Sequence, residues 1–457
     1  MPHASTPTPE LLAPAGSLAM LDTALAFGAN AIYAGQPRYS LRVRNNDFGD
    51  LALLKCGIDR VHAAQGKFYL VSNIFPHGAK LKTYVRDMAP VIALGPDALI
   101  MSDPGLMMMV REAWPDQPIH LSVQANTVNA AAVKFWARNG VSRVILSREL
   151  SLEEIADIRQ ACPDTELEVF VHGALCIAYS GRCLLSGYLN HRDPNQGSCT
   201  NACRWDFKVH PGRTDASGDV FLIEERERRA GSYNVIEEDE HGTYILNSKD
   251  LRAIEHVQRL VDIGVDSLKI EGRTKSPYYV ARTTQAYRAA IDAAVAGRAL
   301  DPALIDSLDG LANRGYTGGF FARHHEAGKN AGRPDDSGFQ NYQRGTSESA
   351  RSLYVGDVVA YDTVRGLAEV EVKNRFAVGD RLELVQPQGN RVIELSAMQQ
   401  ADGSAMPIAP GSGHRVWLPL PADSVGAFLT RFMVQNETMP LESAAAGCTS
   451  GGCEGCG

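Results

Sequence analysis

The sequence predicts an α/β protein whose main domain is a TIM-like (β/α)8 barrel, followed by a small C-terminal antiparallel β-barrel domain. Short, continuous apolar runs alternate with amphipathic segments over the first 275 residues, as expected for buried parallel strands and their covering helices. The runs number eight, and no GxGxxG motif follows the first one. Both observations favour the barrel over its alternative, a doubly wound sheet.

The predicted barrel strands are short runs rich in Val, Ile and Leu. They cover residues 11–15, 31–35, 68–73, 98–103, 119–124, 143–148, 167–173 and 267–273. Amphipathic segments between them, such as 17–28 and 130–140, end in glycine, which is common at helix C-termini. A longer helix is predicted at 276–297, shortly after the eighth strand.

One long insertion interrupts this alternation after the seventh strand. Residues 174–243 contain a cysteine cluster and then a polar stretch rich in Glu and Arg. An insertion at this point lies on the C-terminal face of a barrel. The expected organisation of the chain is a flexible N-terminus at 1–9, the catalytic domain at 10–321, a polar linker at 322–350, the β-barrel domain at 351–440 and a disordered Cys/Gly tail at 441–457.

Composition narrows the classes of protein that fit. No apolar run approaches the roughly 18 residues of a membrane span, and the N-terminus lacks the basic-then-apolar pattern of a signal peptide. We therefore expect a cytoplasmic protein, in which clustered cysteines act as metal ligands or redox groups rather than as disulfides. The net charge of −8 excludes a global basic field, so a nucleic-acid partner would need a local patch.

The cysteine cluster has the spacing C-x6-C-x15-C-x3-C. Its members are Cys176, Cys183, Cys199 and Cys203. Four thiolates suit an iron–sulfur cluster or a structural zinc ion. The irregular spacing and the small residues between the cysteines favour iron–sulfur over zinc, with buried free thiols as the weakest alternative. The tail cysteines, Cys448, Cys453 and Cys456, are interpreted as part of a flexible segment.

Most of the predicted strands end in a polar side chain. The strand-end residues are Asn73, Asp103, Gln124 with Asn126, Arg148 with Glu149, His172, and Glu271 with Arg273. Because a barrel builds its active site where its strands end, these residues predict a pocket. The alternative is that loops are polar everywhere, whatever their function.

The charged members of this set suggest roles. Arg148 and Arg273, with Lys269 nearby, would bind a ligand with more than one carboxylate, or a phosphate, unless the arginines pair with Glu149 or Glu271. His172 lies four residues before Cys176, so proton transfer by His172 or Glu271 competes with a purely structural histidine. The predicted catalytic residues are His172, Glu271 and Arg273; the predicted substrate-binding residues are Asn73, Gln124, Asn126, Arg148 and Lys269.

Two local patches could contact nucleic acid, although solvated charged surfaces explain them equally well. The first contains Arg38, Arg42 and Arg44, with Tyr39 as a stacking candidate. The second contains Arg182, Arg192, Arg204 and Lys208, with Tyr188 and Trp205.

The stretch EVFVHGALCIAYSGRCLLSG resembles the signature of peptidase family U32, the collagenase-like peptidases. Further stretches resemble one branch of that family that hydroxylates tRNA: SVQANTVN, LSRELSLEEI, NQGSCTNACRW, HGTYILNSKDL and SLKIEGRTKSPYYVARTTQAYR. The similarity runs from about residue 10 to 440. It implies a (β/α)8-like catalytic domain and an iron–sulfur site, with 4Fe-4S as the expected form, on Cys176, Cys183, Cys199 and Cys203.

For this branch the resemblance implies 5-hydroxylation of the wobble uridine in the tRNA anticodon loop, with prephenate as co-substrate and without oxygen gas as the hydroxyl donor. An electron donor and iron–sulfur assembly proteins would be further partners. Three alternatives stay open at this point. They are a metal-dependent collagenase-like peptidase, a hydroxylase of ribosomal RNA or small aromatic molecules, and a tRNA-binding chaperone stapled by its cluster.

Overall fold

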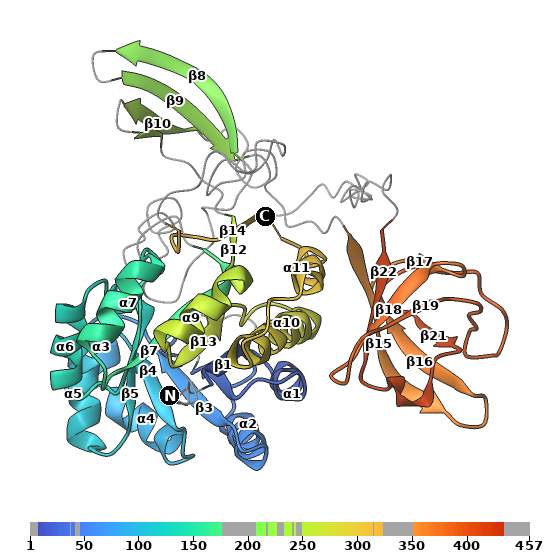
Figure 1. Ribbon diagram of the computed structural model, residues 1–457, viewed down its shortest axis with the longest axis horizontal. Coiled ribbons are helices and arrows are strands. Elements are labelled where there is room, and N and C mark those ends of the chain that lie inside the picture. Colours follow the sequence, from blue (N-terminus) through green and yellow to red (C-terminus); the bar gives the residue numbers. More distant parts are fainter. Residues whose placement is uncertain are drawn as a thin grey trace, which may run out of the picture.

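The computed structural model describes residues 8–36, 38–41, 46–175, 207–215, 218–225, 233–239, 242–243, 249–313, 315–322 and 351–433 of the 457-residue chain. Two folded parts stand out in Figure 1, a helix-covered parallel sheet and a C-terminal antiparallel sheet. In the part of the chain thus described, no helix is both long and apolar enough to cross a membrane.

Eight parallel strands form a closed barrel. They are β1 (Glu10–Pro14), β2 (Ala31–Gly35), β3 (Lys67–Ser72), β4 (Ala98–Met101), β5 (Ile119–Leu121), β6 (Arg143–Ile145), β7 (Glu166–Ala174) and β13 (Ser267–Ile270). Each strand pairs with the next in parallel, and β13 pairs with both β1 and β7, which closes the ring. The predicted barrel is therefore confirmed, and the doubly wound sheet is excluded.

Helices surround the barrel (Figure 1). They are α1 (Leu18–Ala26), α2 (Leu51–Ala63), α3 (Gly78–Leu81), α4 (Tyr84–Ile92), α5 (Pro104–Ala113), α6 (Ala130–Arg138), α7 (Leu152–Ala161), α9 (Val257–Ile263), α10 (Pro277–Val295) and α11 (Pro302–Asp309). Local chemistry sets where they begin. Ser151 and Glu154 form a reciprocal capping box at α7, and Ser276 caps α10 with proline at its first position.

The insertion contains strands that the pattern of its sequence does not predict. β8 (Phe207–Asp215), β9 (Gly218–Glu225), β10 (Tyr233–Asp239) and β11 (Gly242–Thr243) form an antiparallel sheet. Beyond it, β12 (Asp250–Arg252) pairs antiparallel with the end of β7, and β14 (Tyr316–Thr317) pairs parallel with β12. The seventh barrel strand thus extends past the barrel and makes a second set of pairings.

The C-terminal part is antiparallel, as predicted. β15 (Ser352–Asp362), β16 (Leu367–Val372), β18 (Arg381–Val385), β19 (Arg391–Glu394), β21 (Arg415–Leu418) and β22 (Phe428–Phe432) make one sheet in the order β19-β18-β22-β15-β16-β21. Two short strands, β17 (Phe376–Ala377) and β20 (Ile408–Ala409), pair with each other. This part has its own apolar core, which includes Val370, Leu384 and Leu429.

Helix α10 connects the two parts. Tyr278 stacks on Tyr354 of β15, with ring centroids 4.7 Å apart and planes 5° from parallel. One turn further on, Arg282 forms an ion pair with Glu383 of β18. Phe428 of β22 belongs to the same apolar cluster as the barrel core. The C-terminal sheet is therefore packed against the barrel through α10, the helix that follows the barrel strand β13 in the chain.

Candidate active site

The centre of the barrel contains a buried network of charges rather than apolar side chains alone. Glu168, which is fully buried, accepts a hydrogen bond from Lys269 Nζ at 2.8 Å and lies 3.3 Å from Arg143. Arg143 also contacts Glu10 at 2.6 Å and Glu166 at 2.8 Å. Buried charges persist only when they are paired, and here each carboxylate meets a cation. Arg143 and Glu168 thus stabilise the interior of the barrel, and strand-end polarity does not reveal them.

Lys269 lies inside this network, below the strand ends. Its ammonium nitrogen is 4.3 Å from the centroid of the Tyr33 ring and 5.3 Å from that of Phe170. Burial lowers the pKa of Lys269, while the charge of Glu168 acts in the opposite direction. Lys269 therefore belongs to the base of the site, where it supports the aromatic rings instead of lining an open mouth.

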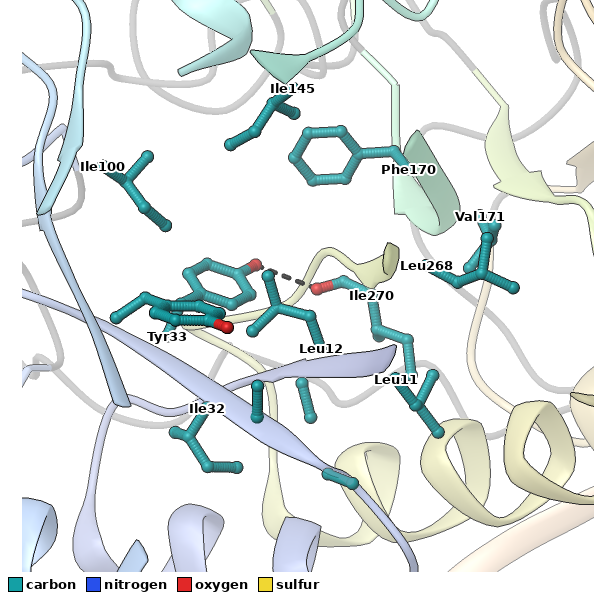
Figure 2. Packing of buried hydrophobic residues seen from close by; sticks show 14 of the residues in the cluster. Leu11, Leu12, Ile32, Tyr33, Ile100, Ile145, Phe170, Val171, Leu268 and Ile270 are labelled. Carbon is teal, nitrogen blue, oxygen red and sulfur yellow. Dashed lines mark hydrogen bonds between the residues drawn. The ribbon is translucent and has the colours of Figure 1, made fainter. Parts of the chain in front are cut away.

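Aromatic and aliphatic side chains from several strands form the layer above it. Figure 2 shows Tyr33, Ile100, Ile145 and Phe170, from β2, β4, β6 and β7, gathered inside the barrel. The Tyr33 hydroxyl donates to the carbonyl oxygen of Ile270 at 2.9 Å, drawn as the dashed line (Figure 2). Burial, with Glu271 second, raises the pKa of Tyr33, which keeps its phenol neutral. Nothing in the sequence marks Tyr33 as functional, because a single tyrosine inside an apolar run is typical of an ordinary buried strand.

At the strand ends, Arg148 and Glu271 meet. Arg148 follows β6 and Glu271 follows β13, and their nearest nitrogen and oxygen atoms are 3.3 Å apart. The guanidinium of Arg148 also lies over the Phe170 ring, 3.9 Å from its centroid. The salt bridge considered as an alternative for Arg148 is therefore present. It leaves most of the five N–H donors of the guanidinium outside this contact, so a ligand carboxylate can still be bound.

Arg273 lies on the β2 side of the same mouth. Its guanidinium carbon is 5.7 Å from the Tyr33 ring centroid, and the residue as a whole is 8% exposed. Gly35, at the end of β2, makes room for it. A Cβ atom built at Gly35 would lie 2.5 Å from Nη1 of Arg273 and closer still to Ser40. This glycine is needed for space rather than for an unusual backbone angle.

Two of the three predicted amide residues, Asn73 and Asn126, connect neighbouring strand-end loops. Asn73 accepts from the backbone N–H of Leu41 at 3.2 Å and donates to Ser122 at 3.3 Å. Asn126 has a left-handed backbone, with φ at 52°, and its side-chain oxygen accepts from Ser147 at 2.7 Å. Gln124 lies in a short 3-10 turn and is half-buried. Asn73 and Asn126 thus hold the rim of the mouth in shape.

His172 occupies a separate, closed environment. Its ring lies among Tyr279, Tyr287 and Tyr316, with centroid distances of 5.8, 5.5 and 5.5 Å. Burial, then the charges of Arg252 and Lys275, lower the pKa of His172 to about 3. Its Nε2 atom has no hydrogen-bond partner among the described residues. An imidazole whose pKa is about 3 is a weak base, so His172 is poorly suited to accept a proton, and Glu271 at the mouth is the better candidate for proton transfer.

Two of the three tyrosines around His172 also hold β7 and the residue that follows β13. The Tyr287 hydroxyl donates to the carbonyl oxygen of Val171 on β7 at 2.7 Å, and the Tyr279 hydroxyl donates to that of Glu271 at 2.9 Å. Both come from α10, on a different face from Tyr278 and Arg282. The same helix therefore contacts the site strands and the C-terminal sheet.

Several predicted residues lie outside the described part of the chain. They are Cys176, Cys183, Cys199, Cys203, Arg42, Arg44, Arg182, Arg192, Arg204, Tyr188, Trp205 and the tail cysteines Cys448, Cys453 and Cys456. β7 ends at Ala174, two residues before the first of the four clustered cysteines. Within the described ranges, no three His, Cys, Asp or Glu side chains gather as metal ligands.

One stacking prediction is wrong. Tyr39 is fully buried, packs edge-on against Tyr84 with centroids 4.9 Å apart, and donates its hydroxyl to Asp87 at 2.7 Å. A tyrosine enclosed in this way cannot stack on a nucleic-acid base. Arg38, next to it, is half exposed, with 49% of its side chain accessible.

The comparisons with known proteins agree with the resemblance seen in the sequence. The model of peptidase family U32 matches residues 16–331, and that of the U32 C-terminal domain matches residues 350–431. The chain is 58% identical over 440 residues to tRNA hydroxylation protein P of Escherichia coli (strain K12), covering 91% of this chain and 94% of that protein.

Two other relatives extend the comparison. A protein of the same name from Haemophilus influenzae is 53% identical over 444 residues, covering 91% of this chain and 94% of that protein. A protein named collagenase from Porphyromonas gingivalis is 29% identical over 403 residues, covering 84% of this chain and 88% of that protein. The two matched family models span both folded parts described above. This chain belongs to peptidase family U32.

Proposed function

We propose that the chain is a tRNA-modifying enzyme that hydroxylates carbon five of the wobble uridine to give 5-hydroxyuridine. The observation that carries the proposal is the 58% identity, over 91% of the chain, to a protein named tRNA hydroxylation protein P. A wobble base in an anticodon loop is already unpaired and accessible, so little energy is spent in bringing it to a barrel mouth. A cytoplasmic location follows from this substrate.

Prephenate is the proposed co-substrate, and the residues at the mouth suit its two carboxylates. Arg148 follows β6 and Arg273 follows β13, the two strands that flank β7, and guanidinium groups of this kind bind carboxylates in bidentate fashion. Glu271 orients Arg148 from one side, and the Phe170 ring supports it from below. In this arrangement Arg148 and Arg273 bind the co-substrate, and Glu271 transfers protons at the reacting carbon.

An iron–sulfur cluster, proposed as 4Fe-4S, would be held by Cys176, Cys183, Cys199 and Cys203. Their spacing and the reducing compartment support this assignment. The cluster would supply the electron-transfer chemistry that hydroxylation requires. The first of these cysteines, Cys176, comes two residues after β7 in the sequence, and β7 also contributes Glu168 and Phe170 to the barrel.

The deciding experiment measures 5-hydroxyuridine in tRNA by nucleoside mass spectrometry. A strain that lacks the gene should lose the nucleoside, and the wild-type gene should restore it. Cys176→Ala and Arg273→Ala should not restore it, whereas the matched control Cys56→Ala on α2 should, because Cys56 lies on an outer helix. Unchanged tRNA in the deletion strain would refute the proposal.

A peptidase is the second candidate, since the Porphyromonas relative is named a collagenase. The sequence contains neither an HExxH zinc motif nor a GxSxG nucleophile elbow. Incubation of the purified protein with gelatin should leave the gelatin intact. Cleavage that is lost with Cys176→Ala, together with unchanged tRNA, would favour the peptidase instead.

A further inference from the structure

A group of basic side chains lies beside the mouth, on the segment that follows β3 and on the loop that follows β2. We propose that this basic rim, defined as Arg38, Lys80, Lys82 and Arg86, binds the phosphates of the RNA backbone and so guides the anticodon arm to the mouth. The inference rests on the proposed tRNA function and adds to it the surface that the RNA crosses.

The charge of the rim is strongly unbalanced. Between residues 74 and 88 the one acidic residue is Asp87, in a chain whose net charge is −8. Arg38 lies 2.9 Å from Asp87, and Arg86 lies 3.0 Å from the same carboxylate. Lys80 and Lys82 add two further cations. A concentrated positive patch on a negatively charged protein is the electrostatic signature of a polyanion site.

The accessibility of the rim fits this role. The side chain of Arg86 is 75% exposed and that of Arg38 is 49% exposed. Lys82 is exposed, and Lys80 is half-buried. Partial burial, and after it the charge of Arg38, lower the pKa of Lys80, so Arg38 and Lys80 repel each other. Bound phosphates would relieve this repulsion, so the folded protein is poised to accept them.

The rim is fixed in place rather than loosely attached. Arg38 donates to the Thr83 hydroxyl at 3.1 Å, which joins the loop after β2 to the start of α4. Beneath it, the buried Tyr39 donates to Asp87 and packs against Tyr84. Arg38 is therefore held at a set position before RNA arrives, which reduces the ordering entropy that this side chain loses on binding.

The same loop connects the rim to the site. The N–H of Leu41 donates to Asn73 at 3.2 Å, and the N–H of Ile74 donates to the carbonyl oxygen of Tyr39 at 3.3 Å. Ser40 and Nη1 of Arg273 both border the space in front of Gly35. An RNA backbone bound along the basic rim thus comes to the Arg273 side of the mouth within a few nucleotides.

The test measures tRNA binding by the full-length protein as a function of salt concentration. The variant Lys80→Ala/Lys82→Ala/Arg86→Ala removes three cations from the rim. Its matched control, Lys55→Ala/Lys134→Ala/Arg138→Ala, removes three exposed cations from α2 and α6. Each phosphate contact contributes about 0.7–0.9 to the slope of log K against log salt. The rim variant should therefore reduce the slope by about 2, and the control should leave it unchanged.

The outcomes separate the two proposals. A wild-type protein that neither binds tRNA nor restores 5-hydroxyuridine would refute the proposed function. A wild-type protein that does both, with the same salt slope in the rim variant, would refute the rim alone. Equal loss of slope in the rim variant and the control would also refute it, because the binding would then depend on total charge and not on this surface.

Discussion

Replacing Glu168 by glutamine removes the negative charge at the centre of the barrel while keeping the shape of the side chain. Glu168 is fully buried, and Lys269 beside it is 3% exposed. Arg143 keeps Glu10 and Glu166 as partners, so it stays compensated. Lys269 is the residue whose ion-pair partner is lost, and it cannot reach water without leaving the barrel.

The size of the effect follows from these contacts. Removing one partner of a buried ion pair typically costs about 3–5 kcal/mol, because the remaining charge is left uncompensated. The Tyr33 ring, 4.3 Å from Nζ, retains part of the stabilisation, so the lower end of that range applies. We expect Glu168→Gln to lower the free energy of unfolding by about 3 kcal/mol.

A double-mutant cycle tests this reasoning by urea denaturation, followed by circular dichroism. Lys269→Met keeps the length of the lysine stem and removes the charge. Glu168→Gln/Lys269→Met should regain at least about 2 kcal/mol relative to Glu168→Gln, since neither charge then remains. A Glu168→Gln variant destabilised by less than about 1 kcal/mol, or a double variant no more stable than it, would refute a tightly coupled pair.

Three further predictions concern pH, space and metal. The pKa of His172 is about 3 in the folded protein and about 6.5 in the unfolded chain. The neutral imidazole therefore contributes fully to the free energy of unfolding above pH 6.5, and this contribution falls as the pH drops toward 3. At pH 5 wild type should have lost about 2 kcal/mol of unfolding free energy that His172→Gln does not lose; identical pH profiles by chemical denaturation would contradict this. Gly35→Ala should displace Arg273 and reduce the rate of tRNA hydroxylation by about tenfold or more with the fold intact by circular dichroism; full activity would show that the guanidinium need not occupy this space. Cys176→Ala should reduce the iron bound per chain and the absorbance near 400 nm, whereas Cys162→Ala, at the end of α7, should not; equal iron in both would exclude Cys176 as a ligand.

The barrel was predictable because its strands are continuous apolar runs, a pattern that survives without knowledge of tertiary contacts. All eight predicted runs correspond to barrel strands. The strands of the insertion were not predicted. β8 and β10 are mostly polar, and the apolar run in β9, at residues 220–223, is short and lies in a stretch rich in Glu and Arg. Antiparallel sheets of this kind follow from cross-strand partners more than from local composition.

The candidate site was only partly predictable, for a related reason. Strand-end polarity points to Arg148, Glu271 and Arg273, because loops after parallel strands meet at one face. It cannot point to Glu168, a charge inside a strand whose partners come from sequence positions more than 20 residues away. Nor can it show that His172 is enclosed, since the tyrosines around it come from α10 and β14.

Helix α10 has a bearing on how truncated proteins are interpreted. A chain cut before residue 350 would expose Tyr278 and leave Arg282 without Glu383, on the helix that ties β7 and β13 through Tyr287 and Tyr279. Loss of activity after such a cut would therefore have two sources: distortion of the catalytic mouth, and loss of the C-terminal sheet itself. A substitution that breaks the contact while keeping the whole chain, such as Arg282→Met, separates the first source from the second.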